Sequence, residues 1–146
     1  MSKRLYVMCG VLLLGSWIAS SQQGRSVQVQ LNYTGSGSVD ETHKIFVALW
    51  DSPGFTEGTA TAPPIAVQSA TSKNGTVTFS DVQKVPAYVS AAYDPTGHWD
   101  GQSGPPPSGA SLGMYTKAPP KPEPIDMSPR KSVKVTITFD DTVKVP

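Results

Sequence analysis

Hydrophobic and polar residues alternate with a period of two in one long segment near each end of the chain. The apolar positions are Val27, Val29, Leu31 and Tyr33 in residues 26–33, and Val133, Val135, Ile137 and Phe139 in residues 132–139. A period of two is typical of a β-strand that buries one face. We therefore expect a half-buried strand at each of these two segments.

Four further segments have the composition of strands, namely residues 43–50, 65–70, 76–80 and 87–93. The first of them is apolar at nearly every position, which indicates a central strand covered on both faces or partly covered by a loop. Asn74-Gly75 is the strongest hairpin-turn dipeptide in the chain, so we expect residues 65–70 and 76–80 to pair with each other.

The longest stretch without alternation is the loop 94–124, which holds more than half of the 14 prolines. Long irregular loops inside compact domains are usually functional or mobile. We expect a short edge strand after it, at residues 125–127. No apolar period of 3.6 persists, so no helix longer than a turn is expected. The pattern predicts one all-β domain at 26–140, an antiparallel β-sandwich of about seven strands with Greek-key connections.

Residues 1–21 have the pattern of a secretory signal peptide. A basic start with Lys3 and Arg4 precedes a charge-free apolar run, and small residues at 19–21 offer a cleavage site near Ser21. The run of about 15 residues is short for a bilayer core of about 30 Å, so we expect no membrane insertion after cleavage. The sequence therefore predicts a secreted or periplasmic protein.

Composition excludes several classes of function. The only cysteine, Cys9, lies inside the predicted signal peptide, so we expect no disulfide, thiolate metal site or cysteine nucleophile in the mature chain. Cys9 also precedes most of the apolar run, which argues against lipid anchoring. Two of the 12 basic residues leave with the leader, so ten remain against 11 acidic residues and the mature net charge is −1. These scattered basic residues do not predict nucleic-acid binding.

Asp94, Thr96 and Asp100 are the candidate cation ligands in the sequence. Ca²⁺ takes about six to eight oxygen ligands, so two carboxylates and a hydroxyl would make a weak site. The alternative is that Asp94 forms an Asx-type turn, while Gly97 and Gly101 supply unusual backbone angles. No other cofactor is expected.

Aromatic residues suggest a binding surface at the loop 94–115. The candidate binding residues are Trp50, Asp51, Tyr93, His98, Trp99 and Tyr115. Aromatic side chains on loops of a rigid sandwich can stack against a sugar or a peptide. We place Trp50 and Asp51 at the same end of the sandwich as this loop. The alternative for Trp99 is that it folds back and caps the open end of the core.

A catalytic triad of His98, Asp100 and one of Ser103, Ser108 or Ser111 is not favoured. The sequence contains no nucleophile-elbow motif and no recognisable oxyanion element. We therefore expect a protein that is not an enzyme.

Several segments carry a resemblance to a known family. They are IFVALWD at 45–51, FSDV at 79–82, PAY at 86–88, DPTGHWDG at 94–101 and Gly104-Pro105. These segments resemble a bacterial secreted family of uncharacterised function with a prealbumin-like (transthyretin-like) sandwich, grouped near carboxypeptidase-regulatory-like modules. The family's turn is usually rich in Asp and Asn, whereas this chain retains only Asp94 and Asp100 as carboxylates there. The chain also lacks the C-terminal tetrapeptide of the transthyretin-like hydrolases.

These observations predict an exported, non-enzymatic β-sandwich that contacts an envelope or extracellular protein, or a glycan, through the loop 94–115. The alternative is a module stabilised by Ca²⁺ through Asp94 and Asp100. A hydrolase is the least favoured of the three hypotheses.

Overall fold

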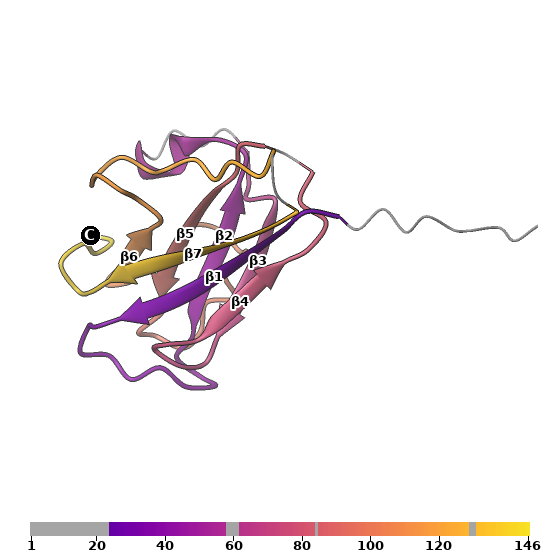
Figure 1. Ribbon diagram of the computed structural model, residues 1–146. Helices are drawn as coiled ribbons and strands as arrows, with labels where there is room; N and C mark the ends of the chain where they lie inside the picture. Colours follow the sequence, from indigo (N-terminus) through magenta and orange to yellow (C-terminus); the bar gives the residue numbers. More distant parts are fainter. Residues whose placement is uncertain (1–23, 58–61, 84, 129–130) are drawn as a thin grey trace, which may run out of the picture.

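The computed structural model describes residues 24–57, 62–83, 85–128 and 131–146, and the predicted signal peptide lies outside them. These residues form seven strands and one short 3₁₀ helix (Figure 1). The elements are β1 (Ser26–Tyr33), β2 (Ile45–Trp50), η1 (Pro53–Glu57), β3 (Ala66–Ala70), β4 (Thr76–Phe79), β5 (Tyr88–Tyr93), β6 (Ser111–Met114) and β7 (Ser132–Phe139). Among the described residues, no helix is long and apolar enough to cross a membrane.

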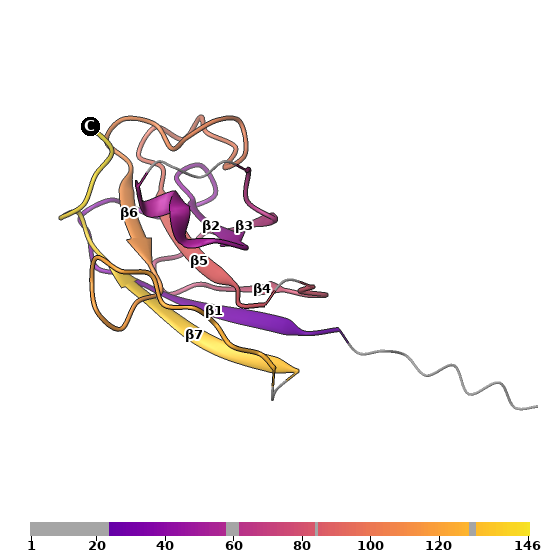
Figure 2. The same cartoon turned by 90° about the horizontal axis from the view of Figure 1, so that it is seen from above.

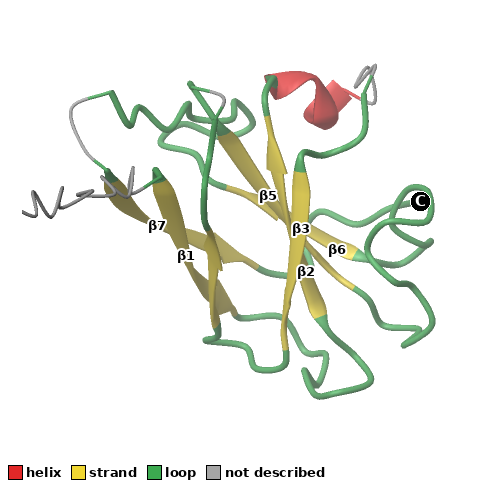
Figure 3. Cartoon of the chain, turned by 90° about the vertical axis from the view of Figure 1, so that its right-hand side faces the viewer, coloured by secondary structure: helices red, strands yellow, loops and turns green. Residues whose placement is uncertain are grey.

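The strands form two sheets that pack face to face (Figure 2). Sheet A has the order β4-β1-β7, and sheet B has the order β3-β2-β5-β6. Figure 3 shows η1 beyond the end of sheet B, between β2 and β3. The predicted all-β sandwich is therefore confirmed.

The core lies between the two sheets and is built from the inward positions of the alternating strands. Its fully buried side chains include Val27, Val29, Leu31, Ile45, Val47, Leu49, Val89 and Ile137. Every second residue of a strand points to the same face, so the alternation in the sequence becomes one apolar layer per sheet. The buried face predicted for β1 is confirmed.

The prediction that all strand pairs are antiparallel is wrong for β1 and β7. These strands run parallel along their whole length, from Ser26 beside Ser132 to Tyr33 beside Phe139. Parallel neighbours need a long crossover connection, and here the five other strands lie between them in the sequence. Alternation of apolar and polar residues looks the same in parallel and in antiparallel strand pairs, so the sequence pattern did not distinguish the two arrangements.

The prediction that Asn74-Gly75 forms a hairpin turn is also wrong. β3 pairs with β2 and β4 pairs with β1, so the connection between β3 and β4 passes from sheet B to sheet A. The N–H of Gly75 donates to the carbonyl oxygen of Ser72 at 3.1 Å, which closes a turn at this crossing. Ile65, which we expected inside the strand, precedes β3 and is 49% exposed.

The predicted loop 94–124 contains β6, which the sequence pattern did not reveal. β6 has only four residues, and its Gly113 breaks any apolar alternation. A Cβ atom at Gly113 would lie 2.6 Å from Cβ of Phe139, so glycine allows β6 to approach β7 closely. The edge strand expected at 125–127 is a single bridge between Ala87 and Ile125, although Ile125 and Met127 are both buried.

The C-terminal tail covers the outer edge of β6. The N–H of Leu112 donates to the carbonyl oxygen of Val143 at 2.8 Å. The N–H of Val145 donates to Ala110 at 2.9 Å, and the N–H of Gly109 donates to Val145 at 2.9 Å. These bonds satisfy backbone groups that would otherwise leave a free sheet edge.

Candidate functional site

The outer faces of the two sheets differ in polarity. Sheet A has polar residues on its outer face, which are Ser26, Gln28, Gln30, Asn32, Thr76, Thr78, Lys134, Thr136 and Thr138. On sheet B, the strand register places mostly apolar residues on the outer face, which are Phe46, Ala48, Trp50, Val67, Tyr88, Ala92, Leu112 and Met114. Except for Ala92, these apolar side chains are half-buried rather than buried. Sheet B therefore has a second apolar surface that does not face the core.

The loop that follows β5 covers one end of this surface. The ring of Trp99 meets the ring of Phe46 edge-on, with centroids 5.0 Å apart and an interplanar angle of 70°. Gly101 has a φ of 81°, and a Cβ atom there would lie 2.3 Å from Cδ1 of Phe46, so the backbone lies directly on the ring. Figure 2 shows this loop on the outer side of sheet B. Trp99 thus folds back onto sheet B rather than over the end of the core.

A second aromatic group occupies the other end of the surface. Trp50 stacks on Phe55 of η1, with ring centroids 5.2 Å apart and an interplanar angle of 21°. The indole N–H of Trp50 donates to Oγ of Ser90 at 2.9 Å, and Tyr88 lies beside Trp50 in the ladder. Hence the central strand is partly covered by neighbouring segments at both ends, which confirms one of the two alternatives predicted for it.

We call this surface the aromatic face of sheet B. Its members are Phe46, Trp50, Phe55, Tyr88, Trp99, Leu112 and Met114. Five of them were not among the binding residues predicted from the sequence: Phe46, Phe55, Tyr88, Leu112 and Met114. The signal available in the sequence was the uninterrupted apolar run of β2, which leaves apolar side chains on both faces of a strand.

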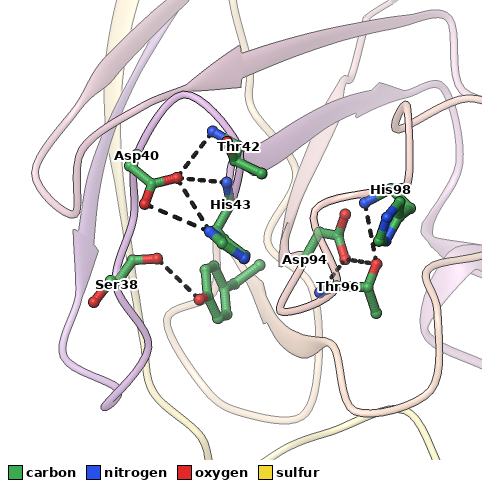
Figure 4. A network of polar contacts seen from close by, with 8 residues as sticks. Ser38, Asp40, Thr42, His43, Asp94, Thr96 and His98 are labelled. Atoms are coloured by element: carbon green, nitrogen blue, oxygen red, sulfur yellow. Dashed lines mark hydrogen bonds and ion pairs between the residues drawn. The ribbon is translucent and has the colours of Figure 1, made fainter.

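Asp94 organises the loop that carries Trp99. Oδ1 accepts the N–H and the hydroxyl of Thr96 at 2.8 and 2.6 Å, and Oδ2 accepts the N–H of Trp99 at 2.9 Å. The N–H of His98 donates to the Thr96 hydroxyl at 3.2 Å (Figure 4). Asp94 is only 1% exposed. Burial alone would raise the pKa of this carboxyl, but the hydrogen bonds outweigh burial and hold its pKa below the ordinary value.

Asp100 forms a second, separate turn in the same loop. Its Oδ1 accepts the N–H groups of Gln102 and Ser103 at 2.8 and 2.6 Å, and its Oδ2 accepts the Ser103 hydroxyl at 2.5 Å. These bonds, led by that of the Ser103 hydroxyl, lower the pKa of Asp100 to about 2. The hydrogen bonds of Asp100 thus go to Gln102 and Ser103 and not to His98, so His98, Asp100 and Ser103 do not have a triad arrangement.

The oxygens proposed as cation ligands are therefore engaged with their own turns. Asp94 binds the Thr96 hydroxyl, and Asp100 binds residues that follow it. In the part of the chain that the structure describes, no three His, Cys, Asp or Glu side chains gather as a metal site requires. The Ca²⁺ hypothesis stays a prediction, for which Asp94, Thr96 and Asp100 remain the candidate ligands.

The loop before β2 packs beside the Asp94 turn. Asp40 accepts the N–H groups of Thr42 and His43 at 2.9 and 2.7 Å, and its Oδ1 lies 3.2 Å from Nδ1 of His43 (Figure 4). The N–H of His43 contributes most to lowering the pKa of Asp40. A Cβ atom at Gly97 would lie 2.8 Å from Cγ2 of Thr42, so the two loops are in close contact.

The expectation that Trp50 and Asp51 share an end with the Asp94 loop is wrong. β2 and β5 are antiparallel, with Ile45 beside Tyr93 and Trp50 beside Tyr88. The end of β2 therefore lies at the start of β5, whereas Asp94 follows its end. Trp50 and Asp51 are at the opposite end of sheet B.

Two further candidate binding residues, Tyr93 and Tyr115, do not lie on the surface of the loop after β5. Tyr93 points into the sandwich, where its ring stacks on Tyr33 at 5.0 Å and its hydroxyl donates to the carbonyl oxygen of Ser38 at 2.9 Å. Tyr115 packs against the core, and its N–H donates to Val89 at 3.1 Å. Of the candidate binding residues, only His98 and Trp99 lie together in the loop.

A pocket of about 150 Å³ opens between the sheets beside β3 and β4. Its lining includes Leu49, Ile65, Phe79 and Val82 and none of the candidate binding residues. Pockets for small-molecule ligands usually measure about 300–1,000 Å³. Its size does not favour a small-molecule site there, so the aromatic face of sheet B is the better candidate surface.

No protein-family model matches this chain, and no curated protein is significantly similar to it. The prealbumin-like resemblance therefore stays a prediction. Among solved structures, an alternative pilotin from the type II secretion system of Vibrio cholerae matches with 15% sequence identity. The match covers 79% of this chain and 96% of that chain, with a TM-score of 0.41. We base no functional inference on a likeness this distant.

Proposed function

We propose that this protein is an exported, non-enzymatic β-sandwich that binds a macromolecular partner outside the cytoplasm through the aromatic face of sheet B. The observation that carries the proposal is the contrast between the outer faces of the two sheets. A two-layer sandwich needs only its inner faces to be apolar, and sheet A follows this rule. Sheet B instead adds half-buried aromatic and aliphatic side chains on its outer face.

Aromatic residues and methionine are enriched in the central parts of protein interfaces. Trp50, Tyr88, Trp99 and Met114 supply this chemistry on one face. Neighbouring apolar side chains that stay partly exposed mark interaction sites on soluble proteins. An envelope or extracellular protein is the partner class that this surface fits first, and a glycan that stacks on the half-buried rings is the second.

Two other observations support the remaining parts of the proposal. Export rests on the leader pattern of residues 1–21. The absence of enzymatic activity is proposed because His98 and Asp100 do not form the hydrogen bond that a triad needs.

Site-specific photo-crosslinking tests the proposal. A photoreactive amino acid at Met114 probes the aromatic face, and the same group at Thr78, an exposed residue of β4 on the polar face of sheet A, is the matched control. In cells that export the protein, we expect a discrete adduct from position 114 and none from position 78. Protease treatment of the adduct then separates a protein partner from a glycan. Equal labelling at the two positions, or no adduct at position 114, would contradict the proposal.

Trp99→Ala separates binding from packing within the same experiment. Because Trp99 contacts Phe46, we expect this variant to lose about 1–3 kcal/mol of unfolding free energy. A lower adduct yield at position 114, measured at a temperature where the variant is folded, would assign Trp99 to the contact surface. An unchanged adduct yield would show that Trp99 covers sheet B and does not contribute to partner binding.

A further inference from the structure

The four edge strands of the sandwich differ in length and protection. The β6 edge is covered by the C-terminal tail through backbone hydrogen bonds to Ala110 and Leu112. β3 and β4 have five and four residues. β7 has eight residues and pairs only with β1 (Figure 3). It is therefore the longest edge that the sandwich offers.

The register of the β1–β7 ladder defines which backbone groups of β7 are free. The N–H of Ser26 donates to Lys131 at 2.8 Å, and the N–H of Thr34 donates to Phe139 at 2.9 Å. Alternate residues of a strand in a ladder direct both backbone groups to the same neighbour. The odd-numbered residues from 131 to 139 therefore face β1, and the even-numbered residues between them face away.

Four residues of β7 thus direct their N–H and C=O groups away from the sheet. They are Ser132, Lys134, Thr136 and Thr138, and all four are exposed. Within the described parts of the chain, none of these eight backbone groups has a hydrogen-bond partner. A row of free, alternating donors and acceptors of this length matches the backbone of one further extended strand.

We propose that the free edge of β7 is a strand-addition site for an extended segment of another protein. The segment pairs with Ser132, Lys134, Thr136 and Thr138 and becomes the fourth strand of sheet A. This site lies on the opposite sheet from the aromatic face and does not depend on the function proposed for that face.

The side chains of β7 indicate the chemistry of the added strand. Lys134 lies in the middle of the edge, and among the described residues it forms no ion pair. A lysine on an exposed edge disfavours pairing between identical strands, because the pairing would bring like charges near each other. A carboxylate opposite Lys134 would instead be favourable. An apolar residue on the inner side of the added strand would cover Val133, which is only partly buried.

Two synthetic peptides test the proposal. One has eight alternating Thr and Val residues with Glu replacing a central Thr, and the other has Lys at the same position. We expect the Glu peptide to slow amide exchange at Lys134, Thr136 and Thr138 and to bind roughly fivefold more tightly than the Lys peptide. In Lys134→Glu the preference between the peptides should reverse. The proposal is overturned if neither peptide slows these amides at millimolar concentration, or if Lys134→Glu leaves the preference unchanged.

A proline substitution gives a second, independent readout. The N–H of Thr136 points away from β1, so Thr136→Pro removes an edge donor without removing a ladder bond. Thr78→Pro on β4 is the matched control, because the N–H of Thr78 also points away from β1 in its ladder. We expect Thr136→Pro to abolish peptide binding and Thr78→Pro to retain it. Binding that survives Thr136→Pro contradicts the proposal, and the Lys134→Glu test stands if either proline variant fails to fold. Neither result changes the crosslinking expected at Met114.

Discussion

Asp141 connects three segments that are far apart in the sequence. Its Oδ1 accepts the hydroxyls of Tyr33 and Ser111 at 2.5 and 2.7 Å, and its Oδ2 accepts the N–H and the hydroxyl of Ser36 at 2.9 Å. The hydroxyl of Tyr33 contributes most to holding the pKa of Asp141 well below its ordinary value. Burial, together with the hydrogen bond to Asp141, raises the pKa of Tyr33 to about 12.

The Asp141 cluster predicts a dependence of stability on pH. A carboxyl whose folded-state pKa is depressed adds stability above its unfolded pKa of about 3.9 and loses it as the pH falls toward the folded pKa. Asp141→Asn should cost about 1 kcal/mol at pH 7, and the difference from the wild type should shrink below pH 4. Urea unfolding of both proteins between pH 7 and 2 measures this. A difference in unfolding free energy that stays constant over that pH range would show that the charge of Asp141 does not contribute to stability.

The two left-handed glycines of the loop after β5 provide a matched pair of variants. Gly101→Ala adds a Cβ atom that would lie 2.3 Å from Phe46, whereas Gly104→Ala meets nothing within 4 Å. Both variants force alanine into a positive φ, which costs about 1 kcal/mol. We expect Gly101→Ala to lose a further 1–3 kcal/mol or so, because the loop and the ring must separate. Equal losses in urea unfolding would show that the loop does not rest on Phe46.

At the scale of the element, the loop after β5 is held by its own carboxylates. Asp94 and Asp100 each accept hydrogen bonds from residues that follow them, so each stabilises its own turn. These two turns place Trp99 and Gly101 against Phe46. The loop is thereby attached to sheet B by the packing of Trp99 and Gly101 on Phe46.

A calcium titration tests this account of the loop. We expect the melting temperature to stay unchanged in millimolar Ca²⁺, because the carboxylate oxygens already accept hydrogen bonds from the protein. Any ligand that binds the folded state must raise its stability. A rise that is lost in both Asp94→Asn and Asp100→Asn would instead support the cation-stabilised alternative.

The C-terminal tail acts as the edge protection of β6. Removing residues 143–146 deletes three backbone hydrogen bonds, at about 0.5–1.5 kcal/mol each. We expect lower stability in urea and concentration-dependent association in sedimentation experiments, because the β6 edge becomes free. Val143→Thr is the control, since it keeps the backbone bonds and Val143 is 58% exposed. A truncated protein that stays monomeric would contradict a protective role.

At the scale of the whole molecule, the sandwich separates two kinds of surface. Sheet A has a polar outer face and a free β7 edge, and sheet B has the aromatic face and a covered β6 edge. The two proposed contact sites lie on different sheets, so a partner at one would not block the other. The partner proposed for the aromatic face lies outside the cytoplasm, whereas the site proposed at β7 does not depend on export.

Export and processing are measurable on the intact chain. Intact-mass analysis of the exported protein should give a mature chain that begins at Gln22, after cleavage at Ser21. Signal peptidase requires small residues before its cleavage site, so Ala19→Arg should prevent processing. A full-length product that remains in the cytoplasm would contradict the predicted localisation.

The sequence by itself determined the strands that bury one face and the sandwich class. Alternation in β1, β2 and β7 is a local property, because successive side chains of any strand point to opposite sides. It also located Asp94 and Trp99 in one loop. It did not reveal β6, whose four residues around Gly113 have no periodic pattern.

Only the tertiary structure decided which strands are neighbours and which loops meet. The parallel β1–β7 pair, the crossing at Asn74-Gly75 and the distance of Trp50 from Asp94 all depend on contacts between segments remote in sequence. Period-two patterns are identical for every possible partner and direction, so they contain no information about pairing. The partner of each strand is selected by the shared core, which exists only when the whole chain is folded.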